Sequence, residues 1–378
     1  MPRSASSSAP ARATPPRQAI HFTRGSDGTR LAYALHGSGP PLIVVSCWVS
    51  HLQHDWESPV WRHFLEDLGE LSTLVRYDER GFGMSDWNVS DFSLAARLGD
   101  LEAIVDALGF ERVALLGMSD GSPIAMLYAA RHPDRVSRLV LYGTVCGERV
   151  VFEGASLLEE ETYQGLVRIG WAGADPRFRR VFTQGFIPDA TEEQMRWFDE
   201  LQRQSTSTAN YLAARAARYR EDITGEIPSI DAPTLILHAV GDRLKTFDNA
   251  TEVASLIRGS RLVPLESRNH ILLEGEPAWE VFVTEVRSFM EPERAAWAAS
   301  AHASGRREAG PHEPLTGREL EVLRLAADGL ANDAIAAAMG LSPRTIERHL
   351  SNAYSKLGLV GKPARAAAVA EVFRQGLA

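Results

Sequence analysis

The chain has 378 residues, of which 44% are apolar and 24% are charged, and its formal net charge is −9. This length exceeds one ordinary domain, and the composition is that of a globular protein with room for a large core. The negative balance argues against nucleic-acid binding by the chain as a whole. No run of about eighteen apolar residues occurs, so we expect neither a membrane helix nor a membrane partner.

The first 18 residues, MPRSASSSAPARATPPRQ, are rich in Pro, Ser, Ala and Arg. They lack the apolar stretch of a secretory signal, and we expect a disordered tail over residues 1–18. Cys47 and Cys146, the only cysteines of the sequence, cannot build a disulfide framework. This cysteine usage favours a reducing, cytoplasmic location.

Short apolar runs alternate with helical periodicity from residue 20 onward. Residues 20–37 predict two strands joined by a turn at Asp27 and Gly28. Strands alternating with helices predict an α/β fold with a mostly parallel sheet, in a domain over residues 19–291. We expect the further strands at 41–46, 72–78, 112–117, 136–143, 233–241 and 260–266, and helices at 94–109, 123–130 and 278–290.

Residues 147–228 interrupt this alternation, because they show helical periodicity and hold many aromatic residues. We interpret them as a helical cap inserted over the sheet. Each aromatic side chain either packs the cap onto the sheet or lines a ligand pocket. For the pocket we choose Trp171, Phe182 and Phe186. The aromatic residues of the interval include Trp171, Phe178, Phe182, Phe186, Trp197, Phe198, Tyr211 and Tyr219.

Ser119 is the candidate nucleophile, since it lies between Gly117 and Gly121 in a Gly-x-Ser-x-Gly frame. A predicted strand enters this frame and a predicted helix leaves it, which is the context of the strained turn that exposes a nucleophilic serine. A serine hydroxyl needs a histidine base, and that base needs a carboxylate to orient it.

Asp242 and His270 follow two later strands in the order that such a triad requires. Both lie where strands end at their carboxyl edges, the edge at which open α/β sheets place their sites. Asp248 is a weaker candidate for the acid, because it lies further beyond the strand. We therefore predict a triad of Ser119, Asp242 and His270.

An oxyanion formed at the serine would need two backbone N–H donors. Asp120 directly follows the nucleophile and supplies one, and the loop after strand 41–46 supplies the other, for which we choose Trp48. Cys47 and Trp48 are also expected to line the ligand pocket.

Two polar segments are interpreted as structural. In YDERGFGMSD, Asp78, Arg80 and Ser85 are expected to hold a turn and the sheet edge. In HLQHDW, His51 and His54 invite a metal interpretation, with Asp55 nearby, but no third ligand of clear spacing accompanies them. We expect a capping or packing role there, and no metal site.

Residues 292–313 are Ala-rich and then contain Gly, Arg and Pro, so we predict a linker. Residues 314–378 show a compact all-helical pattern. Thr316 with Glu319 predicts a capping box. Asn332 is expected to cap a second helix, and Ser342 a third, with Gly340 in the turn between them.

The third helix of this pattern is the candidate DNA-reading element. Residues 312–378 hold eight basic and seven acidic side chains, so any DNA contact must come from this part. A helix-turn-helix presents its second helix to the major groove. We assign base contacts to Thr345, Glu347 and Arg348, and phosphate contacts to Arg344, Asn352 and Lys356.

The C-terminal segment LTGRELEVLRLAADGLANDAIAAAMGLSPRTIERHLSNAYSKLG resembles a LuxR-type helix-turn-helix. The preceding domain resembles α/β-hydrolases. WVSHLQHDWESPVWRHFLEDL and RYDERGFGMSDW resemble the N-terminal domains of bacterial regulators that join an α/β-hydrolase-like domain to a LuxR-type domain. One departure is Ser46-Cys47, where hydrolases often have His-Gly. The resemblance implies a transcriptional regulator that binds double-stranded DNA, forms a homodimer and carries an effector pocket.

Two functional hypotheses remain open. The first is a transcriptional regulator whose hydrolase-like domain binds a small, largely apolar ligand, with or without hydrolysing it. The alternative is a serine esterase or related hydrolase with an appended DNA-binding module. Neither hypothesis requires a cofactor.

Overall fold

The computed structural model describes residues 18–45, 49–146, 157–218, 221–303, 316–327 and 330–356. Residues 1–17 of the predicted N-terminal tail, Cys47 and Trp48 lie outside these ranges, as do residues 304–313 of the predicted linker. None of the helices in the described ranges is long and apolar enough to cross a membrane.

The larger domain is built on a sheet of eight described strands. The first two pairings, β1 with β2 and β2 with β4, are antiparallel, and all the others are parallel. The predicted mostly parallel sheet is therefore confirmed. In spatial order the strands are β1 (Ala19–Arg24), β2 (Arg30–Gly37), β4 (Thr73–Tyr77), β3 (Pro41–Val45), β5 (Val113–Met118), β6 (Val136–Tyr142), β7 (Thr234–Ala239) and β8 (Arg261–Leu265).

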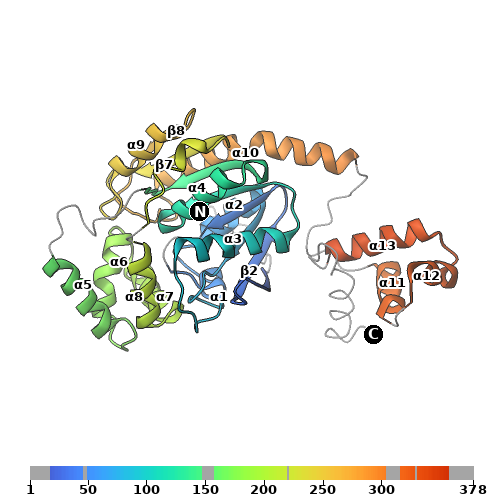
Figure 1. Ribbon diagram of the computed structural model, residues 1–378, viewed down its shortest axis with the longest axis horizontal. Helices are drawn as coiled ribbons and strands as arrows, with labels where there is room; N and C mark the ends of the chain where they lie inside the picture. Colours follow the sequence, from blue (N-terminus) through green and yellow to red (C-terminus); the bar gives the residue numbers. More distant parts are fainter. Residues whose placement is uncertain are drawn as a thin grey trace, which may run out of the picture.

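Helices cover both faces of this sheet (Figure 1). The apolar residues of the central strands are almost fully buried, as expected for parallel strands covered on both sides. One hydrophobic cluster joins the sheet to α2 (Arg62–Leu71) and α10 (Pro277–Ala303). The other joins the opposite face to α3 (Leu94–Leu108), α4 (Ser122–Arg131) and α9 (Phe247–Leu256).

Local sequence signals set the ends of these helices. The Ser93 hydroxyl accepts the N–H of Ala96 at 3.3 Å and caps α3, and Gly109 ends this helix in the left-handed conformation with φ of 66°. Short helical segments complete the domain: α1 (Leu52–Trp56) and the 3₁₀ turns η1 (Ser119–Gly121), η2 (Pro133–Arg135) and η3 (Ile227–Ser229).

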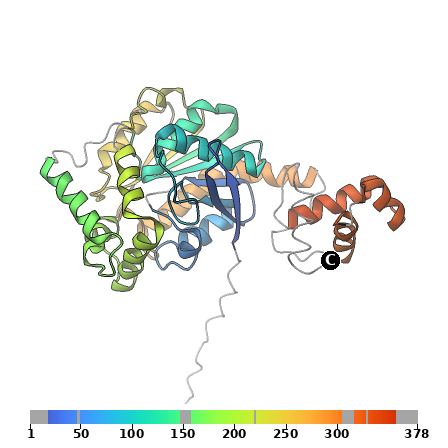
Figure 2. The same ribbon diagram turned by 60° about the horizontal axis from the view of Figure 1, so that its bottom comes forward.

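The described part of the predicted cap consists mainly of α-helices joined by short turns. Its helices lie together at one end of the sheet, drawn in green in Figures 1 and 2. The Arg179 side chain is buried among them and donates hydrogen bonds to four backbone carbonyls, including those of Gly170 and Trp171, which end the first helix. The helices are α5 (Leu157–Gly170), α6 (Arg177–Phe186), α7 (Glu192–Ser205) and α8 (Thr208–Arg218).

The segment that we predicted to be a linker begins as helix. α10 continues through Pro292 to Ala303, so residues 292–303 are helical rather than irregular. The segment is rich in Ala, Glu and Arg, which favour helix. Trp297 also packs edge-on against Phe110, with ring centroids 6.4 Å apart, and this contact anchors the extension to the domain.

In the described part of the C-terminal unit, three helices pack around a hydrophobic core of their own. Thr316 and Glu319 form the predicted capping box, and the Ser342 hydroxyl accepts the N–H of Thr345 as predicted. The predicted cap at Asn332 is wrong, because Ala331 holds the N-cap position and Asn332 is the first helical residue. The helices are α11 (Gly317–Ala327), α12 (Asn332–Met339) and α13 (Pro343–Lys356).

Candidate active site and DNA-binding helix

Ser119 occupies a strained turn between β5 and α4. Its φ is 48°, and it is the one non-glycine residue with positive φ in the described part of the chain. A Cβ atom at Gly117 would lie 2.8 Å from the Ala125 Cβ, so only glycine lets α4 pack this closely after the turn. Ser119 is 2% exposed. Strain of this kind persists where the surroundings enforce it, and it is concentrated at functional sites.

Asp242 and His270 form a buried hydrogen-bonded pair. The Nδ1 atom of His270 lies 2.5 Å from Oδ2 of Asp242. Oδ1 of Asp242 accepts the backbone N–H groups of Leu244 and Lys245 at 2.8 and 3.1 Å, which fixes the carboxylate. The alternative acid, Asp248, is an exposed residue in the first turn of α9. The geometry therefore selects Asp242 as the partner of His270.

The Asp242 carboxylate is held in its charged form. Burial would raise its pKa, but His270 and the hydrogen bonds from His270 and Lys245 outweigh that effect and lower the pKa below the ordinary value. A charged acceptor at Nδ1 keeps the proton of His270 on that nitrogen, so Nε2 is the unprotonated nitrogen and can act as a base.

Sheet register brings Ser119 and His270 to neighbouring positions. Met118, at the end of β5, pairs with Tyr142, at the end of β6. The residues that follow are Ser119 and Gly143, and a Cβ at Gly143 would lie 2.9 Å from Cε1 of His270. The imidazole thus packs directly on the backbone beside the serine turn.

The cap reaches the site through Phe186. The backbone carbonyl of Phe186 accepts the N–H of His270 at 2.8 Å, and its ring lies edge-on to the imidazole at 5.4 Å. The other two predicted pocket aromatics pack inside the cap. Trp171 stacks on Tyr211 with centroids 3.9 Å apart, and Phe182 lies next to Trp171 at 6.3 Å. Phe186 thus contacts His270 through both its backbone carbonyl and its ring.

Cations surround Asp120, the residue after the candidate nucleophile. Its carboxylate pairs with Nζ of Lys245 at 3.1 Å and with Nη1 of Arg218 at 3.7 Å. Its backbone carbonyl accepts a hydrogen bond from Arg97 at 3.0 Å. Sequence reasoning missed these contacts, because it considered only the backbone N–H of Asp120 and the cations come from three distant segments.

Arg97 and Arg218 belong to a buried ionic network. Arg218 pairs with Glu79 at 2.5 Å, and Arg97 pairs with both Glu79 and Glu221. Burial would raise the pKa of Glu79, but the two guanidinium groups outweigh it and lower that pKa. The network connects the end of α8 and the segment after it to the serine turn, because Arg218 contacts both Glu79 and Asp120.

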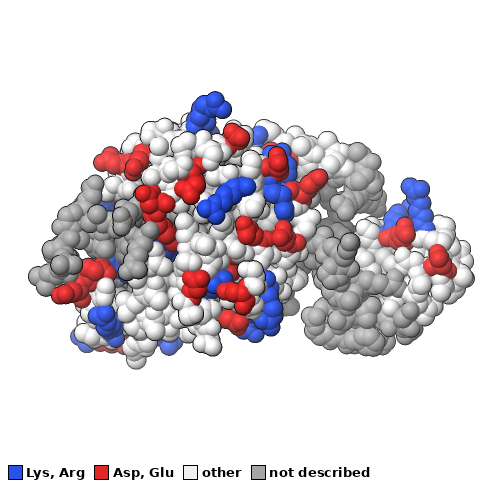
Figure 3. All heavy atoms as spheres, in the orientation of Figure 1, with Lys and Arg blue, Asp and Glu red and all other residues white. Residues whose placement is uncertain are grey.

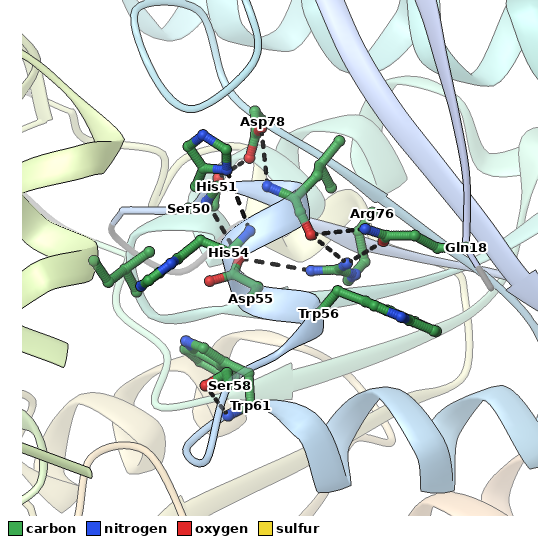
Figure 4. Close-up of polar contacts among 12 residues, drawn as sticks. Gln18, Ser50, His51, His54, Asp55, Trp56, Ser58, Trp61, Arg76 and Asp78 are labelled. Carbon is green, nitrogen blue, oxygen red and sulfur yellow. Dashed lines mark hydrogen bonds and ion pairs between the residues drawn. The ribbon is translucent and has the colours of Figure 1, made fainter. Parts of the chain in front are cut away.

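The predicted donor Trp48 lies outside the described residues. The residues that follow it, Ser50 and Leu52, are held by hydrogen bonds to Asp78. The Asp78 carboxylate accepts a hydrogen bond from the Ser50 hydroxyl at 2.6 Å (Figure 4). It also accepts the N–H groups of Leu52 and Met84. The predicted structural role of Asp78 is thereby confirmed.

Its neighbours Arg80 and Ser85 are structural as well. Arg80 forms two hydrogen bonds to Asp100 at 2.7 Å each, and the Ser85 hydroxyl bridges the Asp78 carbonyl and the N–H of Ala32 on β2.

The HLQHDW segment has the capping role that we predicted. Nδ1 of His51 accepts the N–H of His54 and caps α1, and the His54 ring stacks on Trp197 of the cap at 4.5 Å. Asp55 pairs with Arg76 at 3.6 Å. Within the described ranges, no three His, Cys, Asp or Glu side chains gather in a way that could hold a metal ion.

Four of the six predicted DNA-contacting side chains are exposed on α13. Ile346, Leu350 and Ala353 are buried against α11 and α12. Thr345 is half-buried, and nothing is described of the Lys356 side chain. The remaining candidates are exposed: Arg344, Glu347, Arg348 and Asn352.

Comparison with known proteins divides the chain in the same way. The α/beta hydrolase fold model matches residues 40–277, and the model of bacterial regulatory proteins of the luxR family matches residues 313–369. The chain is 27% identical over 256 residues to the AB hydrolase superfamily protein YisY of Bacillus subtilis (strain 168), an alignment that covers 66% of this chain and 92% of that protein.

Solved structures share the larger domain. A hydrolase from Pseudomonas aeruginosa PA01 superposes with a TM-score of 0.59 at 25% identity, covering 72% of this chain and 98% of that one. An esterase from Exiguobacterium antarcticum has the same TM-score at 24% identity, covering 71% and 98%. The chain therefore belongs to the α/β hydrolase fold family and carries a C-terminal DNA-binding domain of the luxR family.

Proposed function

We propose that the protein is a transcriptional regulator whose α/β hydrolase domain binds a small, largely apolar ligand at Ser119. The observation that carries the proposal is the joining of a luxR-family domain to a hydrolase domain in which the Asp242–His270 pair is intact. A ligand site that controls DNA binding gives both domains a role in one protein. The regulator would act in the cytoplasm as a homodimer.

The surroundings of the triad favour an apolar ligand with one carbonyl group. The Phe186 and Tyr142 rings both lie beside His270, at 5.4 and 6.5 Å between centroids. A carbonyl placed over Ser119 would meet the backbone N–H of Asp120, the donor expected next to the nucleophile. Ligand pockets commonly combine an apolar wall with a few fixed polar groups in this way.

An ester in this position could also be hydrolysed. The Ser119 oxygen would attack the carbonyl carbon while His270 takes the hydroxyl proton, and Asp242 would stabilise the resulting imidazolium. The alcohol would leave with that proton, and water would then release the acid from the serine by the same steps. This chemistry is the basis of the second candidate function, a serine esterase, and the buried Asp242–His270 pair favours it.

The proposed DNA contact lies on α13. Its exposed side chains Arg344 and Arg348 lie in its first half, the part of a recognition helix that reaches base edges. A dimer would read two half-sites about one helical turn apart, or a multiple of that distance. Arg348→Ala should weaken specific binding and relax the base preference, whereas Arg318→Ala on α11, where Arg318 pairs with Glu321, should not.

Ser119→Ala separates the two functions. We expect the wild-type chain to hydrolyse p-nitrophenyl esters and to be labelled by a fluorophosphonate, and Ser119→Ala to do neither. The matched control is Ser122→Ala, which removes another buried serine hydroxyl three residues away.

If the protein is a regulator, Ser119→Ala keeps its ligand-dependent binding to DNA selected with the wild-type chain. If the protein acts by catalysis, Ser119→Ala loses both the hydrolysis of the ester and the change in DNA binding that added ester causes. Failure of the full chain to select any DNA sequence would contradict the regulator.

A further inference from the structure

A second histidine, His238, lies beside the acid of the candidate triad, near the end of β7. Its side chain is fully buried. Its Nε2 atom lies 3.8 Å from Oδ2 of Asp242, the same oxygen that lies 2.5 Å from Nδ1 of His270. Two histidines therefore flank one carboxylate, and the chemistry described above uses only His270.

The Nε2 proton of His238 goes to a backbone carbonyl and not to the carboxylate. Nε2 lies 2.7 Å from the carbonyl oxygen of Lys245. A carbonyl oxygen only accepts hydrogen bonds, so Nε2 carries a proton and donates it. The distance of 3.8 Å to Asp242 is too long for a hydrogen bond. Oδ2 of Asp242 is thus hydrogen-bonded by His270 and not by His238.

His238 is held in its neutral form. Its Nδ1 atom is buried and has no hydrogen-bond partner among the described residues, so a proton on that nitrogen would lack an acceptor. Burial and the nearby His270 lower the pKa of His238, and the hydrogen bond to Lys245 and the charge of Asp242 offset this only in part. A neutral His238 does not compete with a His270 imidazolium for the charge of Asp242.

The hydrogen bond to Lys245 closes the turn that carries the acid. Oδ1 of Asp242 accepts the N–H groups of Leu244 and Lys245 at 2.8 and 3.1 Å. The N–H of Lys245 is thus held by Asp242, while its carbonyl is held by His238. A shift of residues 242–245 away from β7 would break the His238 bond and move the two N–H groups that orient the carboxylate.

β7 is a firm support for this turn, because it is hydrogen-bonded to β6 on one side and to β8 on the other. We propose that His238 is a positioning residue for Asp242, which as a neutral imidazole fastens the turn 242–245 to β7 and leaves Oδ2 of Asp242 to His270. This inference rests on the candidate triad of the proposed function. It applies whether the site only binds a ligand or also hydrolyses it.

Three substitutions separate the hydrogen bond from the bulk of the side chain. The amide nitrogen of His238→Gln lies near the position of Nε2 and can still donate to the Lys245 carbonyl. His238→Asn is one methylene group shorter and does not reach that carbonyl. His238→Met removes the donor with an apolar side chain and replaces His238→Asn if the latter does not fold. Circular dichroism and urea unfolding establish which variants are folded.

His36→Asn is the matched control. His36 on β2 is also buried, and its Nε2 atom donates to a backbone carbonyl, that of Leu65, at 2.6 Å. β2 lies near the opposite edge of the sheet from β7. The control therefore removes a buried hydrogen bond of the same kind without touching the acid.

The direct readout is the ¹H NMR spectrum of the full-length chain. The proton between Nδ1 of His270 and Oδ2 of Asp242 should give a resonance downfield of the amide protons, which His270→Gln removes. We expect His238→Gln and His36→Asn to keep this resonance at the wild-type position. His238→Asn and His238→Met should shift it upfield or abolish it. A merely structural role of His238 would lower stability without moving this resonance.

The rate at which a fluorophosphonate labels Ser119 gives a second readout. It should fall by about tenfold or more in His238→Asn and His238→Met, but by less than about threefold in His238→Gln, because a displaced catalytic group is costly. His36→Asn should be labelled like the wild type.

The inference is overturned if a folded His238→Asn or His238→Met keeps the wild-type resonance, or if His238→Gln loses it as they do. A wild-type chain that shows the resonance but is not labelled would contradict the hydrolase chemistry alone, and the resonance would still decide the role of His238. Absence of the resonance from the wild type would contradict the Asp242–His270 pair and this inference with it.

Discussion

Lys245 contacts three parts of the candidate active site. Its N–H donates to Asp242, its carbonyl accepts a hydrogen bond from Nε2 of His238 at 2.7 Å, and its ammonium group pairs with Asp120 at 3.1 Å. The first two contacts use the backbone, so a side-chain substitution removes only the third. At the scale of one residue, this ammonium group links the loop of the acid to the turn of the nucleophile.

Lys245→Met should therefore slow the labelling of Ser119 by a fluorophosphonate by about tenfold. The effect should be smaller than the roughly hundredfold or greater cost of losing an oxyanion donor, because the Asp120 N–H is displaced rather than removed. Lys245→Arg should restore part of the rate. Arg243→Met, which changes an exposed cation of the same loop, serves as the control. Equal labelling rates for Lys245→Met and the wild type would refute this role.

The raised pKa of Asp55 gives a second prediction at this scale. Burial raises the pKa of Asp55 to about 7, whereas the pKa of an Asp in the unfolded chain is about 4. Between these values the folded chain holds a proton that the unfolded chain releases. The stabilisation is complete below the unfolded pKa and is lost as the pH rises through about 7.

Asp55→Asn cannot titrate, so its free energy of unfolding should rise relative to that of the wild type between about pH 3 and about pH 8. The expected gain is up to about 4 kcal/mol. Urea unfolding followed by tryptophan fluorescence measures it. Asp86→Asn, at a partly exposed ion pair with Arg30, should run parallel to the wild type. If the free energy of unfolding of Asp55→Asn also followed that of the wild type at every pH, Asp55 would not change its protonation in this range.

At the scale of elements, the end of β6 determines where His270 lies. Gly143 has φ of 59°, and a Cβ there would meet the imidazole at 2.9 Å. Gly109, at the end of α3, has a similar φ of 66° but open space around its Cα. The two glycines therefore have similar φ angles, but only Gly143 has a side chain packed against it.

Gly143→Ala and Gly109→Ala should each cost about 1–2 kcal/mol of stability, because both force a side chain into the left-handed region. Gly143→Ala alone should displace His270 and reduce the labelling of Ser119 at least tenfold. Thermal unfolding and fluorophosphonate labelling of the two variants provide the comparison. Similar labelling in both would contradict the close packing of His270 on β6.

The elements and the Asp242–His270 pair were predictable because their signals are local. Ser119 lies in a glycine frame between a strand and a helix, and Asp242 and His270 each follow a strand. The ionic contacts around Asp120 were not predictable, since they join segments far apart in the sequence, such as Glu79 and Arg218. The helical extension past Pro292 was missed because composition alone does not reveal that Trp297 packs on Phe110.

At the scale of the whole molecule, the two domains differ in net charge. The chain has a net charge of −9, whereas residues 312–378 hold eight basic and seven acidic side chains. On the face shown in Figure 3, acidic and basic side chains are interspersed over the larger domain. The proposed binding to DNA through α13 would bring a negatively charged chain to a polyanion, and the affinity for DNA should fall as the salt concentration rises.

The central claim is that the state of the Ser119 site controls the affinity for DNA. The most direct measurement compares wild-type chain before and after stoichiometric labelling of Ser119 with a fluorophosphonate, using fluorescence anisotropy on DNA selected by the unlabelled chain at constant salt. We predict at least a fivefold change in Kd, the lower end of allosteric coupling. Ser119→Ala treated with the same reagent should keep its Kd. Complete labelling that leaves the Kd of the wild type unchanged would contradict the account.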